Sequence, residues 1–163
     1  MRTDLLRKTI IVAASIVLFG LAPHVTAQDK PADNMQILRD KIKADKTLVV
    51  ASNMELTESE AKGFWPIYDA YQKDLQKINR RMATILDGYA ADAKNKSLTD
   101  DKAKKLIDEA LAIEQAEVDL KSNYAPKLSK VLPVIKVARY LQIENKIRSV
   151  VKYDIAQGVP LVK

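Results

Sequence analysis

The chain has 163 residues but no cysteine and a single histidine, His24. Without thiols the protein can form no disulfide bond and has no cysteine nucleophile. Zinc, copper and nickel sites depend largely on thiolate and imidazole ligands, so we expect no metal centre of that kind. Glycine is also scarce, at four residues, whereas alanine, lysine and leucine are the most frequent residues. This composition predicts an all-α fold without strands.

The first 27 residues have the pattern of a cleaved secretory signal peptide. Basic residues precede the uncharged apolar run 9–21, which is shorter than the roughly 20 residues that a membrane-spanning helix needs. The sequence VTA at residues 25–27 then fits the small-x-small cleavage site. We predict that cleavage releases residues 28–163 into the periplasm, with no integral membrane segment.

The predicted cleavage also removes His24. The remaining chain then has no histidine base to place beside a serine nucleophile. We therefore expect a protein that binds rather than catalyses, with no cofactor and no metal. Residues 28–33 should form a flexible N-terminus, and residues 34–163 a single all-helical domain.

Charge is unevenly distributed along the chain. The whole sequence carries a net charge of +6, and residues 121–163 hold nine basic and two acidic side chains. A basic C-terminal third suits acidic proteins, anionic membrane surfaces or unfolded chains as partners. A surface that only keeps the protein soluble is the alternative. Nucleic acid is not an expected partner of an exported protein.

Capping residues and apolar spacing predict four helices: about 34–52, about 57–94, a third beginning at Thr99, and a last one beyond Pro133 that ends near Gln157. The second helix begins with a capping box, in which the side chains of Thr57 and Glu60 bond each other's backbone amides. Thr99 is the predicted N-cap residue of the third helix. Gly158 and Pro160 stop the last helix.

The second helix carries the strongest pattern. Eight apolar residues recur along it at alternating spacings of four and three: Phe64, Tyr68, Tyr71, Leu75, Ile78, Met82, Ile85 and Tyr89. A 3.5-residue period keeps one seam facing a partner helix over many turns. The third helix repeats the spacing, so we predict a long antiparallel helical hairpin. Three pairs should face each other in it: Tyr124 and Tyr68, Glu117 and Leu75, and Ile107 and Ile85.

The last helix changes its apolar face midway. Val134, Ala138 and Leu141 share one side, and a later group lies on nearly the opposite side: Ile143, Ile147, Val150 and Val151. Either the helix is buried on two sides, or it packs first on its own core and later on a second subunit. We favour the second arrangement, a homodimer, because an exposed apolar stripe of that size marks an interface.

Pro66 lies inside the second helix, on the face opposite the seam. It removes one backbone hydrogen bond and should bend the helix. The hairpin is therefore either curved, as in a cradle-like dimer, or locally kinked without consequence. Basic residues on the same outer face either attract acidic segments or are simply solvated: Lys62, Lys73, Lys77, Arg80 and Arg81.

The aromatic residues Phe64, Trp65, Tyr68 and Tyr71 stand close together in the sequence. Aromatics at seam spacing are typical of a core, so we expect three of them inside the protein. Trp65 lies off the seam. It is the one expected to be exposed and available to partner side chains.

Two carboxylates, Glu114 and Glu117, fall within the apolar arc of the third helix. A buried carboxylate pair could serve as acid and base. The simpler interpretation is that one of them accepts the Tyr71 hydroxyl or an arginine from the last helix.

The stretch 139–146 (RYLQIENK) mixes polar and apolar residues where the last helix changes face. It is either a polar network that locks this helix onto the hairpin or an edge that recognises a partner, with Arg139 among the contact residues. We favour the network. Glu144 and Arg148 have the i, i+4 spacing of a helical ion pair.

The two helix starts resemble a known motif. Leu56-Thr57-Glu58-Ser59-Glu60 and Leu98-Thr99-Asp100-Asp101-Lys102 are similar to the repeated LTxxQ motif of the Spy/CpxP family of small periplasmic helical proteins. Glu60 and Lys102 stand where the motif has glutamine. The resemblance implies a cradle-shaped antiparallel dimer, acting as an ATP-independent chaperone or as an envelope-stress adaptor that restrains a sensor kinase. The histidines of metal-sensing relatives have no counterpart in residues 28–163.

These patterns together predict a periplasmic, non-enzymatic helical protein that binds other proteins without nucleotide. Its partner is either a set of protein clients, as for a chaperone or a Skp-like holdase, or one sensor protein. The predicted contact residues are Trp65, Lys73, Lys77, Arg80, Arg81, Arg139, Ile143, Ile147, Val150 and Val151.

Overall fold

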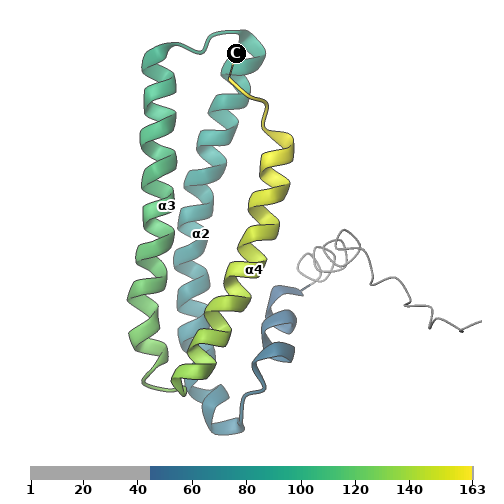
Figure 1. Cartoon of the computed structure of the whole chain (residues 1–163), viewed down its shortest axis with the longest axis vertical. Helices are drawn as coiled ribbons and strands as arrows, with labels where there is room; N and C mark the ends of the chain where they lie inside the picture. The colour runs from purple at the N-terminus through teal and green to yellow at the C-terminus, as the bar shows by residue number, and fades with distance from the viewer. Residues whose placement is uncertain (1–44, 163) are drawn as a thin grey trace, which may run out of the picture. The chain divides into compact units, whose positions relative to one another are not determined.

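A computed structural model describes residues 45–162 of the chain. The predicted signal peptide, the segment 28–33 and the start of the first predicted helix lie outside this range. Three long helices make up most of it: α2 (Glu58–Asn95), α3 (Asp100–Leu128) and α4 (Val134–Gly158) (Figure 1). A helical stretch over residues 45–54 precedes them, two residues longer at its end than predicted. The described residues contain no strand, which confirms the all-α prediction.

Local side-chain chemistry fixes the starts of α2 and α3. The Thr57 hydroxyl accepts the Glu60 amide at 3.3 Å, and the Glu60 carboxylate accepts the Thr57 amide at 2.8 Å. This capping box is the one predicted from sequence. The Thr99 hydroxyl accepts the Lys102 amide at 3.4 Å and caps α3. Between the two helices, Lys96 adopts the left-handed conformation with φ of 53° and ends α2.

α2 and α3 pack against each other as an antiparallel hairpin, in agreement with the predicted seam (Figure 1). The rings of Tyr71 and Tyr124 meet edge to face with centroids 5.3 Å apart, and the Tyr124 hydroxyl donates to Asp74 at 2.7 Å. Tyr124 thus contacts Tyr71, one turn along from the expected Tyr68. The predicted pairing of Ile107 with Ile85 is wrong, because Ile107 is 60% exposed, whereas its neighbours Leu106 and Ala110 are partly buried.

An aromatic cluster joins α2 to α4. Tyr140 is fully buried, and its ring centroid lies 5.2 Å from that of Phe64, 5.7 Å from that of Tyr71 and 6.2 Å from that of Tyr68. All three contacts are edge to face, a geometry that aromatic rings prefer. Trp65, predicted to be exposed, is instead partly buried. Its ring centroid lies 5.0 Å from that of Phe64 and 5.2 Å from that of Tyr68.

The buried face of α4 is one continuous stripe rather than two opposite faces. It consists of Val137, Tyr140, Glu144, Ile147 and Val150. The predicted change of face is therefore wrong. The error arose because a charged residue, Glu144, stands in the middle of the buried stripe and interrupts its apolar pattern in the sequence. Ile147 and Val150, predicted to lie at a subunit interface, are buried within this chain. Val134, at the start of the helix, is 73% exposed.

The outer faces of the helices are largely solvated. α2 continues through Pro66, which lies on its exposed side as predicted. None of the helices within residues 45–162 combines the length and apolar character that crossing a bilayer requires.

Two glycines of α2 provide a test of this packing. A Cβ added at Gly63 would lie 2.8 Å from Cβ of Val131 in the α3–α4 connection, whereas at Gly88 it would meet no atom within 4 Å. We expect Gly63→Ala to lower the free energy of unfolding by about 1–3 kcal/mol through overpacking. Gly88→Ala should raise it by up to about 1 kcal/mol through helix propensity.

Urea denaturation followed by circular dichroism measures both changes. If the two substitutions shift the unfolding midpoint in the same direction, α2 does not approach the α3–α4 connection at Gly63 as described.

Candidate functional site

The backbones of α2 and α4 stay further apart than those of α2 and α3. Across these two fully described helices, no Cα atom of α2 lies within 8 Å of one of α4. Side chains must therefore bridge the space, because closely packed helices have axes only about 8–10 Å apart. The aromatic cluster fills one end of this space. Polar side chains cross part of the remainder.

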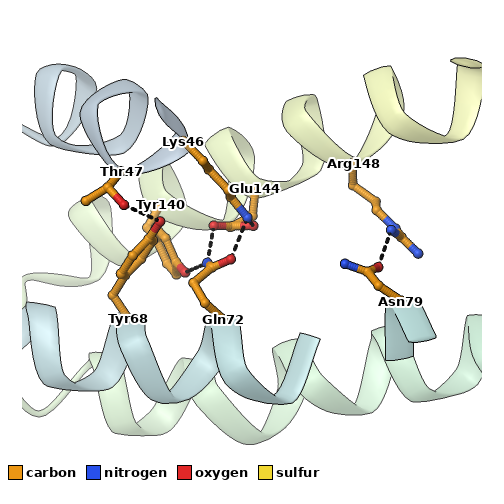
Figure 2. A network of polar contacts seen from close by, with 8 residues as sticks. All are labelled: Lys46, Thr47, Tyr68, Gln72, Asn79, Tyr140, Glu144 and Arg148. Atoms are coloured by element: carbon orange, nitrogen blue, oxygen red, sulfur yellow. Dashed lines mark hydrogen bonds and ion pairs between the residues drawn. The ribbon is translucent and has the colours of Figure 1, made fainter. Parts of the chain in front are cut away.

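The first polar group is centred on Glu144 of α4, which is buried (Figure 2). Its carboxylate accepts Lys46 Nζ at 2.8 Å and Gln72 Nε2 at 2.8 Å. Lys46 Nζ also donates to Gln72 Oε1 at 2.7 Å, and Gln72 Nε2 lies 3.3 Å from the Tyr140 hydroxyl. The helical stretch 45–54, α2 and α4 are thus joined by one network, as predicted for the stretch 139–146.

The network holds Tyr140 as a neutral hydroxyl. Burial raises the pKa of Tyr140 far above its ordinary value of 10, and the nearby charge of Glu144 raises it further. Its hydroxyl therefore stays protonated over the physiological range. Tyr140 acts here as an uncharged hydrogen-bonding partner of Gln72.

The second polar group joins α3 to α4 through Glu117. Arg148 donates from Nη2 to Glu117 and from Nη1 to Asn79 Oδ1 at 2.7 Å, and Lys152 Nζ lies 3.0 Å from the other Glu117 oxygen. This confirms the prediction that a carboxylate of the third helix accepts an arginine from the last helix. The remaining Arg148 nitrogen, Nε, is buried and has no hydrogen-bond partner within residues 45–162.

Glu117 and Glu114 have different surroundings, so the structure does not bring them together as a buried pair. Glu117 is buried and Glu114 is exposed. Burial alone would raise the pKa of Glu117, but the hydrogen bonds from Arg148 and Lys152 outweigh it and leave the pKa below its ordinary value of 4.5. Glu117 is therefore an ionised anchor for two basic side chains. Glu144 and Arg148 do not form the ion pair that their i, i+4 spacing suggests, because each of them bonds a residue on another helix.

An open groove of about 390 Å³ lies between α2 and α4, next to these groups. Leu75, Ile147 and Val151 contribute its apolar side chains, and Gln72, Gln76 and Asn79 contribute amides. The cations along it are Lys46, Lys73 and Arg148, and its carboxylate is Glu144. The groove thus combines an apolar floor with mainly basic charge.

The predicted contact residues are divided among several places. Lys73, Ile147 and Val151 come together in the groove. Val150 is buried, while Trp65 and Ile143 are partly buried against the core.

The other predicted basic contacts lie outside the groove. Lys77 pairs with Asp74 at 2.8 Å, Arg81 with Glu109 across the hairpin at 2.8 Å, and Arg139 with Glu55 at 3.1 Å. Arg80 is exposed on α2. These four side chains are therefore surface cations rather than parts of one site.

Sequence reasoning missed Lys46, Gln72 and Asn79. A signal for two of them was present, because the amides Gln72, Gln76 and Asn79 follow one another at spacings of four and three on α2. Such spacing places them on one side of the helix, parallel to the apolar seam. Lys46 had no comparable signal, since its contacts lie 26 and 98 residues away.

The site is suited to binding. Within residues 45–162, no group of three or more histidine, cysteine, aspartate or glutamate side chains could hold a metal ion. Both buried carboxylates, Glu117 and Glu144, are engaged by basic side chains. The apolar floor and the basic side chains can hold an acidic, partly apolar ligand.

Comparison with known proteins adds no relative: no family model matches the chain, and no curated protein or solved structure shows significant similarity to it. The similarity to the LTxxQ motif at Thr57 and Thr99 stays a prediction from the sequence.

Neutralising Glu117 tests the anchor. We expect Glu117→Gln to lower the free energy of unfolding at pH 7 by about 3 kcal/mol, because it leaves Arg148 without its buried counter-charge. The lowered pKa means that the ionised carboxylate stabilises the fold above the ordinary pKa of 4.5. This contribution is lost as the pH falls through the folded-state pKa.

The difference between the two proteins should therefore shrink in urea denaturation at pH 3. Glu114→Gln, an exposed neighbour on the same helix, is the control and should change stability little at either pH. A difference for Glu117→Gln that stays constant down to pH 3 would contradict the assignment.

Proposed function

We propose that the protein is a periplasmic, non-enzymatic helical protein that holds unfolded protein clients, as an ATP-independent chaperone does. The observation that carries this proposal is an apolar stripe on the outer face of α3. Ile107 and Leu111 are each 60% exposed and Val118 is 54% exposed. The opposite face of the same helix packs on α2, so the stripe faces outward.

An apolar stripe of this kind suits transient binding of unfolded chains. Removing apolar surface from water gains roughly 25 cal/mol per Å², and this gain has no directional requirement. A surface that exposes several aliphatic side chains can therefore bind many sequences weakly. The net charge of +6 adds attraction for acidic segments.

The remaining parts of the proposal rest on the sequence. The signal-peptide pattern of residues 1–27 supports export to the periplasm. None of the four glycines belongs to a phosphate-binding loop motif, which agrees with action without nucleotide. A homodimer is the assembly that we propose, and sedimentation velocity of the purified protein tests it.

A second candidate function is an adaptor that binds one sensor protein. The groove between α2 and α4 favours it, because a bounded site with fixed charges selects one partner rather than many. Affinity capture from an envelope extract separates the two functions. A broad set of unfolded proteins supports the chaperone, and one stoichiometric partner supports the adaptor.

The chaperone proposal predicts the effect of polar substitutions in the stripe. The triple variant Ile107→Ser, Leu111→Ser, Val118→Ser should suppress the aggregation of a heat-unfolded client at least about tenfold less well, since it loses well over 1.4 kcal/mol of apolar contact. Light scattering at increasing ratios of protein to client measures the effect.

A matched control changes charge on the same helix, with Lys104→Ser and Lys105→Ser, and should retain the protection. Equal protection by the stripe variant and the control would rule out α3 as the client-binding surface.

A further inference from the structure

We propose that the groove between α2 and α4 is a docking site for an acidic amphipathic helix of a partner protein. The inference deepens the adaptor function by giving the chemistry of the partner segment. It depends on three observations: a helix already packs against both α2 and α4 next to the groove, the groove itself is open, and its unpaired charge is basic.

The helical stretch 45–54 shows how a helix packs against both α2 and α4. Its residues Val50 and Met54 are fully buried in the core cluster that also contains Phe64 and Tyr140. Lys46, two turns earlier than Met54, bonds both Gln72 of α2 and Glu144 of α4 (Figure 2). The surface that α2 and α4 form together therefore accepts apolar side chains of a helix at i and i+4 spacing.

Beyond Lys46 the same space is open. The groove is lined by residues 72–79 of α2 and 144–151 of α4, with Lys46 at one end. Its volume of about 390 Å³ lies near the lower end of the roughly 300–1,000 Å³ of ligand pockets. A few side chains of a docked helix can fill it, and the floor of Leu75, Ile147 and Val151 is suited to apolar ones.

The charges of the groove select an acidic occupant. Glu144 already receives Lys46 and Gln72, so its charge is not available to a partner. Lys73 is exposed beside the groove and forms no ion pair with the other residues of 45–162. Arg148 already pairs with Glu117, and its Nε is buried away from solvent. A carboxylate flanking the apolar side chains of a docked helix therefore complements Lys73.

Charge also favours a partner protein over the chain's own residues 34–44 as the occupant of the groove. Residues 34–44 (NMQILRDKIKA) contain three basic residues and one acidic residue. They carry the same sign of charge as the groove, and like charges across an interface oppose binding. An acidic helix from another protein fits the charge better.

The test uses a fluorescently labelled synthetic peptide. It is an amphipathic helix with leucine at i, i+4 spacing and glutamate on both flanks, and its matched control has lysine in place of every glutamate. Fluorescence anisotropy with the full-length mature chain should show saturable binding of the acidic peptide, weakening as salt is added. The basic peptide should bind at least about tenfold more weakly.

Variants assign the binding to the groove. Lys73→Glu should weaken the acidic peptide about tenfold and strengthen the basic one, because it reverses one charge at the rim. Val151→Asp should abolish binding by placing a charge on the floor. Lys105→Glu on α3 makes the same change in net charge away from the groove and should leave the affinity unchanged.

Three results would overturn the proposal. The two peptides could bind equally, or Lys73→Glu could leave their affinities unchanged. A disulfide closing within one chain between Ile42→Cys and Gln76→Cys would show that the chain fills its own groove, and this readout is clean because the chain has no cysteine. A dimer split by Val151→Asp in sedimentation would show that a second copy occupies it. Client protection by α3 is measured separately, so the failure of one proposal does not decide the other.

Discussion

The packing of Tyr140 against the aromatic rings of α2 is the interaction on which the rest of the structure depends. The hairpin of α2 and α3 has its own apolar seam. The backbones of α2 and α4, in contrast, stay so far apart that only side chains connect them. A ring that contacts Phe64, Tyr68 and Tyr71 at once bridges that distance with apolar area. Smaller residues at these positions would leave either a cavity or a collapsed contact between the helices.

The same spacing explains why the polar groups lie where they do. Beyond the rings, Ile147 and Leu75 continue the core, and long polar side chains cross the rest of the space. Lys46, Gln72 and Arg148 extend across it and satisfy Glu144 and Glu117 as they do so. Ionic contacts of this kind add little net stability compared with apolar packing, but the loss of one partner leaves a buried charge uncompensated. The open groove is the part of the space that neither rings nor ion pairs fill.

Patterns that act over a few residues could be predicted from the sequence, and contacts that depend on helix spacing could not. The capping box of Thr57 and Glu60 and the seam of α2 follow from local geometry, as does the hairpin. The burial of Glu144 broke the apolar period of α4, so its true face was missed. The groove could not be anticipated, because its width is set by aromatic side chains meeting across elements that are about 70 residues apart.

Trp65 gives the molecule a spectroscopic reporter of its own. It is the sole tryptophan of the chain, and it stacks edge to face on Phe64 and Tyr68 at the junction where α4 meets the hairpin. Its indole is partly buried, so its emission is sensitive to water entering that junction. Separation of α4 from the hairpin would therefore shift the wavelength of the tryptophan emission maximum. Unwinding of the far end of the hairpin, around Lys96, would leave this wavelength unchanged. The order in which the two ends of the bundle open can be followed without adding a label.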